Sequence, residues 1–167
     1  MEQPAFVVAI SAIIVSVVAL AASIYFGWCT RDHNRRSVKP LPHLVLINND
    51  DRICVRLYNN GLGPLVLRKV TARNGQKVSG HLIEIVPKRP PNLYFRHFVK
   101  VRPGRAVLPD IRLDLLDIEL DVKDPAAVGY RDALRDALGD ISIDVDYTDI
   151  YESRFARYTE HLTRFRR

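Results

Sequence analysis

The sequence predicts a mainly β protein with one N-terminal transmembrane helix. Its soluble part is expected to form an antiparallel, immunoglobulin-like β-sandwich with one short helix near residues 125–138. Residues 5–28 carry no charged side chain and are mostly apolar. From residue 41 onward, short alternating segments are separated by turn signals such as Asn74-Gly75, which is typical of an all-β domain. Only one later segment has both a helix start signal and a helix stop signal.

The apolar segment is long enough to cross a membrane. At 1.5 Å per residue, a helix over residues 5–28 exceeds the roughly 30 Å of the hydrocarbon layer. Tyr25 and Trp28 fit the aromatic belt at the membrane interface. A cleaved secretory signal is the alternative, because residues 19–21 (Ala-Leu-Ala) resemble a cleavage site. However, the leader has no Lys or Arg, and the apolar segment continues past that site.

A basic cluster follows the apolar segment and predicts its orientation. The cluster consists of Arg31, Arg35, Arg36 and Lys39, whereas the N-terminal flank has no Lys or Arg. Because such cations are retained on the cytoplasmic side, we expect a single-pass membrane protein with its N-terminus outside. The same cations are expected to attract anionic lipids. The expected organisation has four parts: a tail (1–4), a transmembrane helix (5–28), a basic juxtamembrane linker (29–40) and a cytoplasmic β-sandwich (41–167).

Small residues recur along the apolar segment at intervals of four and three, which places them on one helical face. They are Ala5, Ala9, Ala12, Ser16, Ala19 and Ser23. Small residues let two membrane helices approach closely, so this face predicts a homo-oligomer. The alternative is that the pattern reflects composition alone, since small residues are common in this segment.

The soluble part is predicted to contain up to nine strands and one helix. The helix has Asp124 as its N-cap, Pro125 at its first position and Gly139 as its stop signal. Its apolar stripe is expected to use Val128, Ala133, Leu134, Ala137 and Leu138. The predicted strands cover residues 43–48, 52–58, 65–72, 77–86, 93–101, about 105–111, 116–122, 141–147 and 154–162.

Charge in the soluble part is arranged in blocks. Residues 52–105 contain 12 Lys or Arg and one acid, whereas residues 110–152 contain 13 acids and four bases. The blocks can pair with each other as surface ion pairs within one chain. Alternatively, a basic and an acidic face can pair head to tail between neighbouring copies.

No pattern in the sequence predicts catalysis. The five histidines and two cysteines lack metal-ligand spacing, and no phosphate-binding loop or nucleophile motif occurs. Asp144 and Asp146 are expected on the wet face of a strand rather than in a carboxylate cluster. We therefore expect a non-enzymatic protein without a cofactor or metal. Cys29 and Cys54 are expected to be reduced thiols.

The C-terminal segment RFARYTEHLTRFRR interleaves arginine with aromatic residues. Such a segment can bind single-stranded nucleic acid, lie against an anionic membrane, or form a charged edge strand. Nothing else in the chain favours nucleic-acid binding, so nucleic acid is the least expected partner.

Three groups of residues resemble a broad group of uncharacterised bacterial single-pass membrane proteins. The first is an R-x-H-N-R-x-S-V-x-P junction at residues 31–40, and the second is an N-x-G-x-G-P turn at residues 59–64. The third is the sequence Y-x-D-I-Y at residues 147–151. The resemblance implies one N-terminal span followed by a β-rich domain, and it implies no catalytic residue.

The expected function is that of a membrane-anchored scaffold or effector that self-associates at the inner membrane. Its most specific form is an oligomeric pore used as a defence accessory. The alternative is a membrane-tethered binding module for a partner protein or a nucleic acid.

Overall fold

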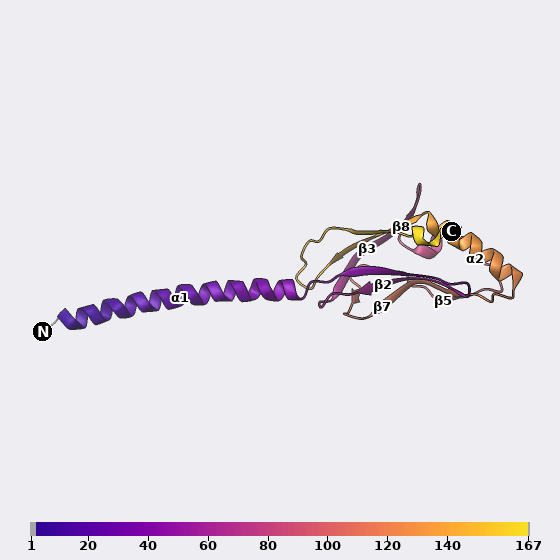
Figure 1. The fold of residues 1–167 in the computed structure, drawn as a ribbon. Coiled ribbons are helices and arrows are strands. Elements are labelled where there is room, and N and C mark those ends of the chain that lie inside the picture. The colour runs from indigo at the N-terminus through magenta and orange to yellow at the C-terminus, as the bar shows by residue number, and fades with distance from the viewer. Residues whose placement is uncertain (1–2, 167) are drawn as a thin grey trace. The chain divides into compact units, whose positions relative to one another are not determined.

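The computed structural model describes residues 3–166 and divides the chain into two compact units (Figure 1). The first unit is helix α1 (Gln3–Ser37), and the second begins at Val38 and contains two antiparallel sheets. This confirms the prediction of a mainly β chain with one long, apolar N-terminal helix. Residues 1–2 of the expected tail, Arg167 and the side chain of Ala5 lie outside the described residues.

Helix α1 continues nine residues beyond Trp28, through most of the segment that was expected to be a linker. No glycine or proline interrupts residues 28–37. Arg36 pairs with Asp32 one turn earlier at 2.8 Å, and the Ser37 hydroxyl donates to the His33 carbonyl at 2.8 Å. Among the described residues, the segment from Phe6 to Ser37 is the one helix long and apolar enough to cross a membrane.

The first sheet has the strand order β1-β2-β7-β5. Its strands are β1 (Pro42–Asn48), β2 (Arg52–Asn59), β7 (Arg112–Glu119) and β5 (Phe95–His97). Leu44 and Leu46 of β1 lie opposite Leu57 and Val55 of β2, so the apolar side chains of the hairpin share one face. A β-bulge after Val55 shifts the register against β7.

The second sheet has the strand order β4-β3-β8-β9, with β6 paired to the start of β3. Its strands are β4 (Lys77–Ser79), β3 (Leu65–Asn74), β8 (Ile141–Thr148), β9 (Tyr158–His161) and β6 (Ala106–Val107). The expected Asn74-Gly75 turn joins β3 to β4, and Gly75 adopts φ = 54°, which glycine tolerates best.

The two sheets lie in two layers, and one hydrophobic core draws side chains from both (Figure 1). Ile53, Leu57 and Ile118 come from the first sheet, and Leu67 and Ile143 come from the second; all five are fully buried. Burial is not strictly alternating, because residues 53–57 of β2 are buried one after another. The prediction that Asp144 lies on the wet face is wrong, because Asp144 is buried in β8 and pairs with Arg73.

Helix α2 (Pro125–Gly139) connects β7 to β8 and has the predicted boundaries. The Asp124 side chain accepts from the Ala126 backbone N–H at 2.9 Å, as an N-cap does. The expected buried stripe is only partly right. Leu134 and Leu138 are buried, but Ala133 is exposed, and the remaining buried positions are Ala127, Tyr130, Arg131, Arg135 and Gly139.

Several predicted strands are much shorter in the structure. The expected strand over residues 77–86 is β4 followed by the 3-10 helix η1 (Leu82–Glu84). The expected strands over residues 93–101 and 154–162 contract to β5 and β9, and a second 3-10 helix, η2 (Thr163–Phe165), follows β9. Prolines at positions 87, 90 and 91 and glycines at 80 and 104 restrict regular pairing in this part of the chain.

Candidate functional site

The last three residues of the first motif, residues 38–40, lie with the second and third motifs at one end of the second unit. We call this the junction end, and it comprises residues 38–41, 59–64, 107–111 and 148–155. Asn60 donates its backbone N–H to the Leu41 carbonyl at 2.8 Å, and Asp110 donates to the Asn59 carbonyl at 3.2 Å. Val66 at the start of β3 pairs with Thr148 at the end of β8. The junction end is therefore the end at which the chain enters the unit from α1.

Asn59 uses its whole side-chain amide to hold these segments together. Its oxygen accepts from the backbone N–H of Leu41 at 3.2 Å and of Gly61 at 3.0 Å. Its nitrogen donates to the carbonyls of Gly63 at 2.7 Å and Val107 at 3.0 Å. Asn59 is fully buried, so each of these bonds replaces a lost contact with water.

Gly61 and Gly63 allow the turn to lie directly against the entering chain. A Cβ atom at Gly61 would lie 2.3 Å from the Lys39 carbonyl oxygen, and one at Gly63 would lie 1.8 Å from the Val38 carbonyl oxygen. No side chain fits at either distance, because both neighbours are backbone. The N-x-G-x-G-P motif thus fixes the last residues of the junction motif.

The third motif forms a tight turn after β8. The buried Asp149 carboxylate accepts from the backbone N–H groups of Tyr151 and Ser153, both at 2.9 Å. Burial alone would raise the pKa of Asp149, but these hydrogen bonds outweigh it and leave the pKa below its ordinary value. The turn is therefore held by a charged group at neutral pH.

A shallow basic hollow of about 480 Å³ lies beside this turn, between residues of β3, β8 and the segment that follows β8. The rings of Tyr147 and Phe155 stack in it at 5.3 Å, and Lys39 lies 5.7 Å above the Phe155 ring. Arg157 already pairs with Asp146 at 2.7 Å. The remaining lining residues are Arg68, Lys69, Ser153 and Arg154. The hollow can accept an anionic group beside an aromatic surface.

The C-terminal arginine segment contributes to the fold more than to this hollow. Residues 158–161 form β9, which is an edge strand of the second sheet. Leu162 and Phe165 are fully buried, and Arg166 pairs with Asp140. These observations favour the edge-strand interpretation among the three alternatives.

The expected helix-association face lies on α1. Ala9, Ala12, Ser16, Ala19 and Ser23 recur with helical spacing, and a shallow groove of about 310 Å³ runs past Ala12 and Ser16. The hydroxyl of Ser16 donates to the Ala12 carbonyl at 2.7 Å, and that of Ser23 donates to the Ala19 carbonyl at 2.8 Å. Both hydroxyls are thus satisfied within the helix and need no partner from water.

The predicted aromatic and basic residues lie at the end of the apolar segment. Tyr25 and Trp28 are exposed, and Trp28, Arg31, Asp32 and Arg35 line one hollow on α1. Arg36 is engaged by Asp32, whereas Lys39 belongs to the second unit and contacts Phe155. The structure therefore distributes the four predicted cations over two places.

A buried ion-pair network that the sequence analysis missed joins β2 to β7. Asp117 is fully buried and accepts two hydrogen bonds from Arg52, at 2.8 and 2.9 Å. Arg56 bonds Asp114 at 2.5 Å and reaches Asp117 at 3.5 Å. Burial would raise the pKa of Asp117, but the two arginines outweigh it and lower that pKa. This network pairs the basic block with the acidic block within one chain.

Further pairs of the same kind weaken the head-to-tail alternative for the charge blocks. Arg73 pairs with Asp144 at 2.9 Å, and Arg96 pairs with Glu119. The strand order explains them, because β3 neighbours β8 and β5 neighbours β7. Charge pairing between the blocks therefore acts within the chain.

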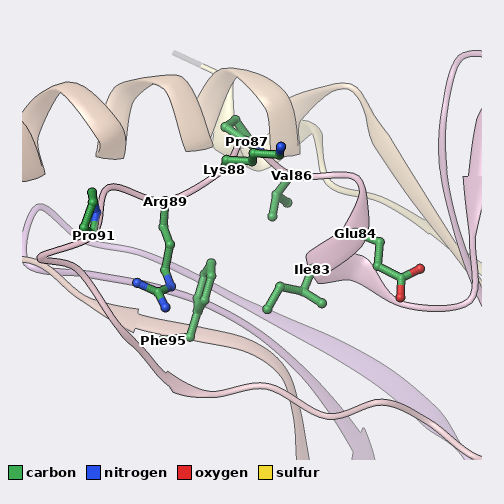
Figure 2. A pocket seen from close by; sticks show the side chains of 8 residues that line it. All are labelled: Ile83, Glu84, Val86, Pro87, Lys88, Arg89, Pro91 and Phe95. Carbon is green, nitrogen blue, oxygen red and sulfur yellow. The ribbon is translucent and has the colours of Figure 1, made fainter.

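A second hollow, of about 580 Å³, lies away from the junction end (Figure 2). Ile83, Val86 and Phe95 supply apolar surface, Lys88 and Arg89 add positive charge, and Glu84 adds negative charge. The loop that bears them is held by Tyr130 of α2, whose hydroxyl donates to the Pro87 carbonyl at 3.1 Å. The hollow therefore combines apolar surface with charges of both signs.

Within residues 3–166, no three His, Cys, Asp or Glu side chains lie close enough to hold a metal ion together. The fold and the site together define a β-rich unit joined by four residues to one long apolar helix. No family model, curated protein or solved structure matches the chain. The resemblance to bacterial single-pass membrane proteins stays a prediction.

Proposed function

We propose that the chain is a non-enzymatic, single-pass protein of the bacterial inner membrane, which self-associates as a scaffold or effector. The observation that carries this proposal is α1, whose apolar segment from Phe6 onward has no buried residue in the structure. Leaving so many Val, Ile, Leu and Phe side chains in water would cost about 25 cal/mol for each Å² of apolar surface. Lipid removes that cost.

The N-terminus lies outside and the β-rich unit lies in the cytoplasm. The basis for this orientation is the asymmetry of Lys and Arg around the apolar segment. Tyr25 and Trp28, exposed on the last apolar turns, fit the level of the lipid headgroups.

Self-association uses the small-residue face of α1. Its support is the groove at Ala12 and Ser16, together with serine hydroxyls that are satisfied within the helix. A second helix can approach such a groove closely, and van der Waals packing then favours the pair over lipid contact. An oligomeric pore that serves as a defence accessory is the most specific form of this proposal, and a conductance measurement in planar bilayers tests it.

The second unit has an immunoglobulin-like arrangement in this proposal. The order β1-β2-β7-β5 corresponds to strands A-B-E-D, and β4-β3-β8-β9 corresponds to C′-C-F-G. Helix α2 then lies in the E–F connection. Domains of this kind commonly present loops at their ends for binding, which suits a scaffold.

The decisive experiment measures the mass of the detergent-solubilised full chain. The double variant Ala12→Leu/Ser16→Leu fills the groove and is expected to give monomers. The matched control Ser11→Leu/Ala21→Leu adds the same bulk on the opposite half of the helix and should keep the wild-type mass. A wild-type monomer, or loss of the oligomer in the control alone, contradicts self-association through this face.

The alternative is a membrane-tethered binding module for a partner protein, and the hollow in Figure 2 favours it. Isolation of the full chain from membranes separates the two functions. A stoichiometric foreign protein that is lost in Ile83→Asp supports the module, whereas copies of the chain alone support self-association.

A further inference from the structure

Large apolar side chains are exposed together at the junction end. Leu62 is 77% exposed, and five further side chains at this end are between 47% and 57% exposed. They come from the segment before β1, the 59–64 turn, the segment before β7 and the turn after β8. We call the set the apolar rim: Leu41, Leu62, Leu108, Ile111, Ile150 and Tyr151.

The apolar rim belongs to one end because the backbone ties its segments together. Leu41 is bonded to Asn59 and Asn60, and Asp110 is bonded to Asn59. Ile111 donates its N–H to the Leu108 carbonyl at 3.2 Å. Ile150 and Tyr151 lie in the turn held by Asp149. The rim residues are therefore presented by fixed loops, and they cannot collapse into the core.

Exposed cations surround the apolar rim. Arg112 is the first residue of β7 and lies opposite Tyr58. The carbonyl of Arg105 accepts a hydrogen bond from the Leu67 backbone N–H, near the start of β3. Arg68 and Arg154 line the basic hollow beside the rim, and Lys39 lies over Phe155. The exposed acids of these segments are Asp110 and Glu152. Exposed apolar side chains flanked by Lys and Arg are typical of a surface that inserts into an anionic lipid interface.

The covalent connection brings this end within reach of lipid. Only residues 38–41 separate the end of α1 from β1, and four extended residues span at most about 14 Å. The helical segment between Trp28 and Ser37 adds about 13 Å, part of which lies among the headgroups.

We propose that the junction end is a lipid-docking surface: Leu62, Leu108, Ile111, Ile150 and Tyr151 insert into the headgroup region of an anionic leaflet while the surrounding cations contact lipid phosphates. This inference rests on the proposed membrane anchoring, and it adds a second contact with the membrane. The β-rich unit then lies on the bilayer surface with the junction end towards lipid.

The test uses the full chain with Cys29→Ser, reconstituted at low density into bilayers of phosphatidylcholine with or without phosphatidylglycerol. In the variant Leu62→Cys, a nitrobenzoxadiazole label is attached to the introduced thiol on the apolar rim. Val78→Cys is the matched control, because Val78 is also exposed and pairs with Arg73, about 26 Å along β3 from Leu65. Cys54 is buried, so we expect the label to react only with the introduced thiol.

The proposal expects a blue-shifted label at position 62 that nitroxide-bearing lipids quench, with greater quenching when phosphatidylglycerol is present. The label at position 78 should remain in water. Arg68→Gln/Arg112→Gln should reduce the dependence on phosphatidylglycerol. Equal emission at both positions overturns the proposal, and so does a blue shift at 62 without lipid quenching, because that result indicates a second copy or a partner protein.

The native Trp28 separates this inference from the proposed function. Quenching of Trp28 by the same lipids shows that α1 is anchored. If Trp28 is quenched and position 62 is not, the helix is anchored and lipid docking is wrong. If Trp28 is not quenched, anchoring itself fails, and the docking proposal fails with it.

Discussion

A Cβ atom on Gly63 would lie 1.8 Å from the carbonyl oxygen of Val38, the first residue of the β-rich unit. At Gly61 and Gly63 the backbone of the 59–64 turn therefore lies directly against the backbone of the entering chain. This contact joins two motifs that are more than twenty residues apart in the sequence. It makes the conformation of the junction part of the folded unit.

Gly63→Ala is expected to destabilise the second unit, because the methyl group must displace backbone that the strands hold. Overpacking of this kind costs about 1–3 kcal/mol, and contact with backbone favours the upper end of that range. Denaturant unfolding of the full chain in detergent, followed by circular dichroism, measures the change. Gly129→Ala is the control: it lies in α2 with open space around it and should stabilise by about 0.5–1 kcal/mol. Equal changes in the free energy of unfolding for the two variants would contradict the close backbone contact at Gly63.

Asn59→Ala should lower the free energy of unfolding by about 3 kcal/mol, because two buried carbonyls and two N–H groups lose their partner. The exposed neighbour Asn60 provides the comparison, and Asn60→Ala should change stability by less than about 0.5 kcal/mol. Hydrogen exchange at the Leu41 and Gly61 amides should rise in Asn59→Ala. Unchanged protection at both amides would show that the Asn59 side chain does not hold these segments together.

The Asp117 network predicts loss of stability in acid. The pKa of Asp117 is lower in the folded chain than its ordinary value of about 3.9, so the unfolded chain binds the proton more tightly. The stabilisation is complete above that ordinary pKa and is lost as the pH falls through the folded pKa. Asp117→Asn should cost about 3 kcal/mol at neutral pH, because Arg52 and Arg56 lose a buried partner.

The pH profile gives the control for this prediction. Asp117→Asn should flatten the decline of unfolding free energy in acid, whereas Asn60→Ala, which removes no titratable group, should leave the slope unchanged. An identical slope in wild type and Asp117→Asn would assign the acid sensitivity to other carboxylates.

The two cysteines should differ in reactivity and can report orientation. Burial raises the pKa of the Cys54 thiol to about 12, whereas Cys29 is exposed on α1. A membrane-impermeant maleimide is expected to label one thiol in the folded chain, and Cys29→Ser should abolish that labelling. Inverted inner-membrane vesicles should be labelled and intact spheroplasts should not. Labelling of intact spheroplasts would reverse the proposed orientation.

Local signals in the sequence predicted local structure well. Asp124, Pro125 and Gly139 gave the boundaries of α2, and Asn74-Gly75 gave the turn between β3 and β4. Each signal acts through its own backbone conformation or hydrogen bond, so it needs no knowledge of distant residues. The apolar segment was predictable for the same reason, because it depends on local composition, but the continuation of α1 from Trp28 to Ser37 was not predicted.

Features that depend on strand pairing could not be predicted. Arg56 and Asp117 look like ordinary polar positions until the β2–β7 register places them together. Arg131 and Arg135 of α2 are buried because they reach Asp50 in the β1–β2 turn. The meeting of the three motifs likewise requires the order of strands in both sheets. The motifs were visible in the sequence, but their common location was not.

The pairing of β3 with β8 has a consequence for biosynthesis. Val66 lies opposite Thr148, so the central pair of the second sheet can form only after residues 141–148 have left the ribosome. Until then, β3 has a free edge, and closing so long a loop is slow. The β1–β2 hairpin, by contrast, can form early. If α1 enters the bilayer first, the incomplete β-rich unit is held at the membrane surface until β8 is synthesised. There, targeting factors and chaperones can shield the free edge of β3 from other copies of the chain.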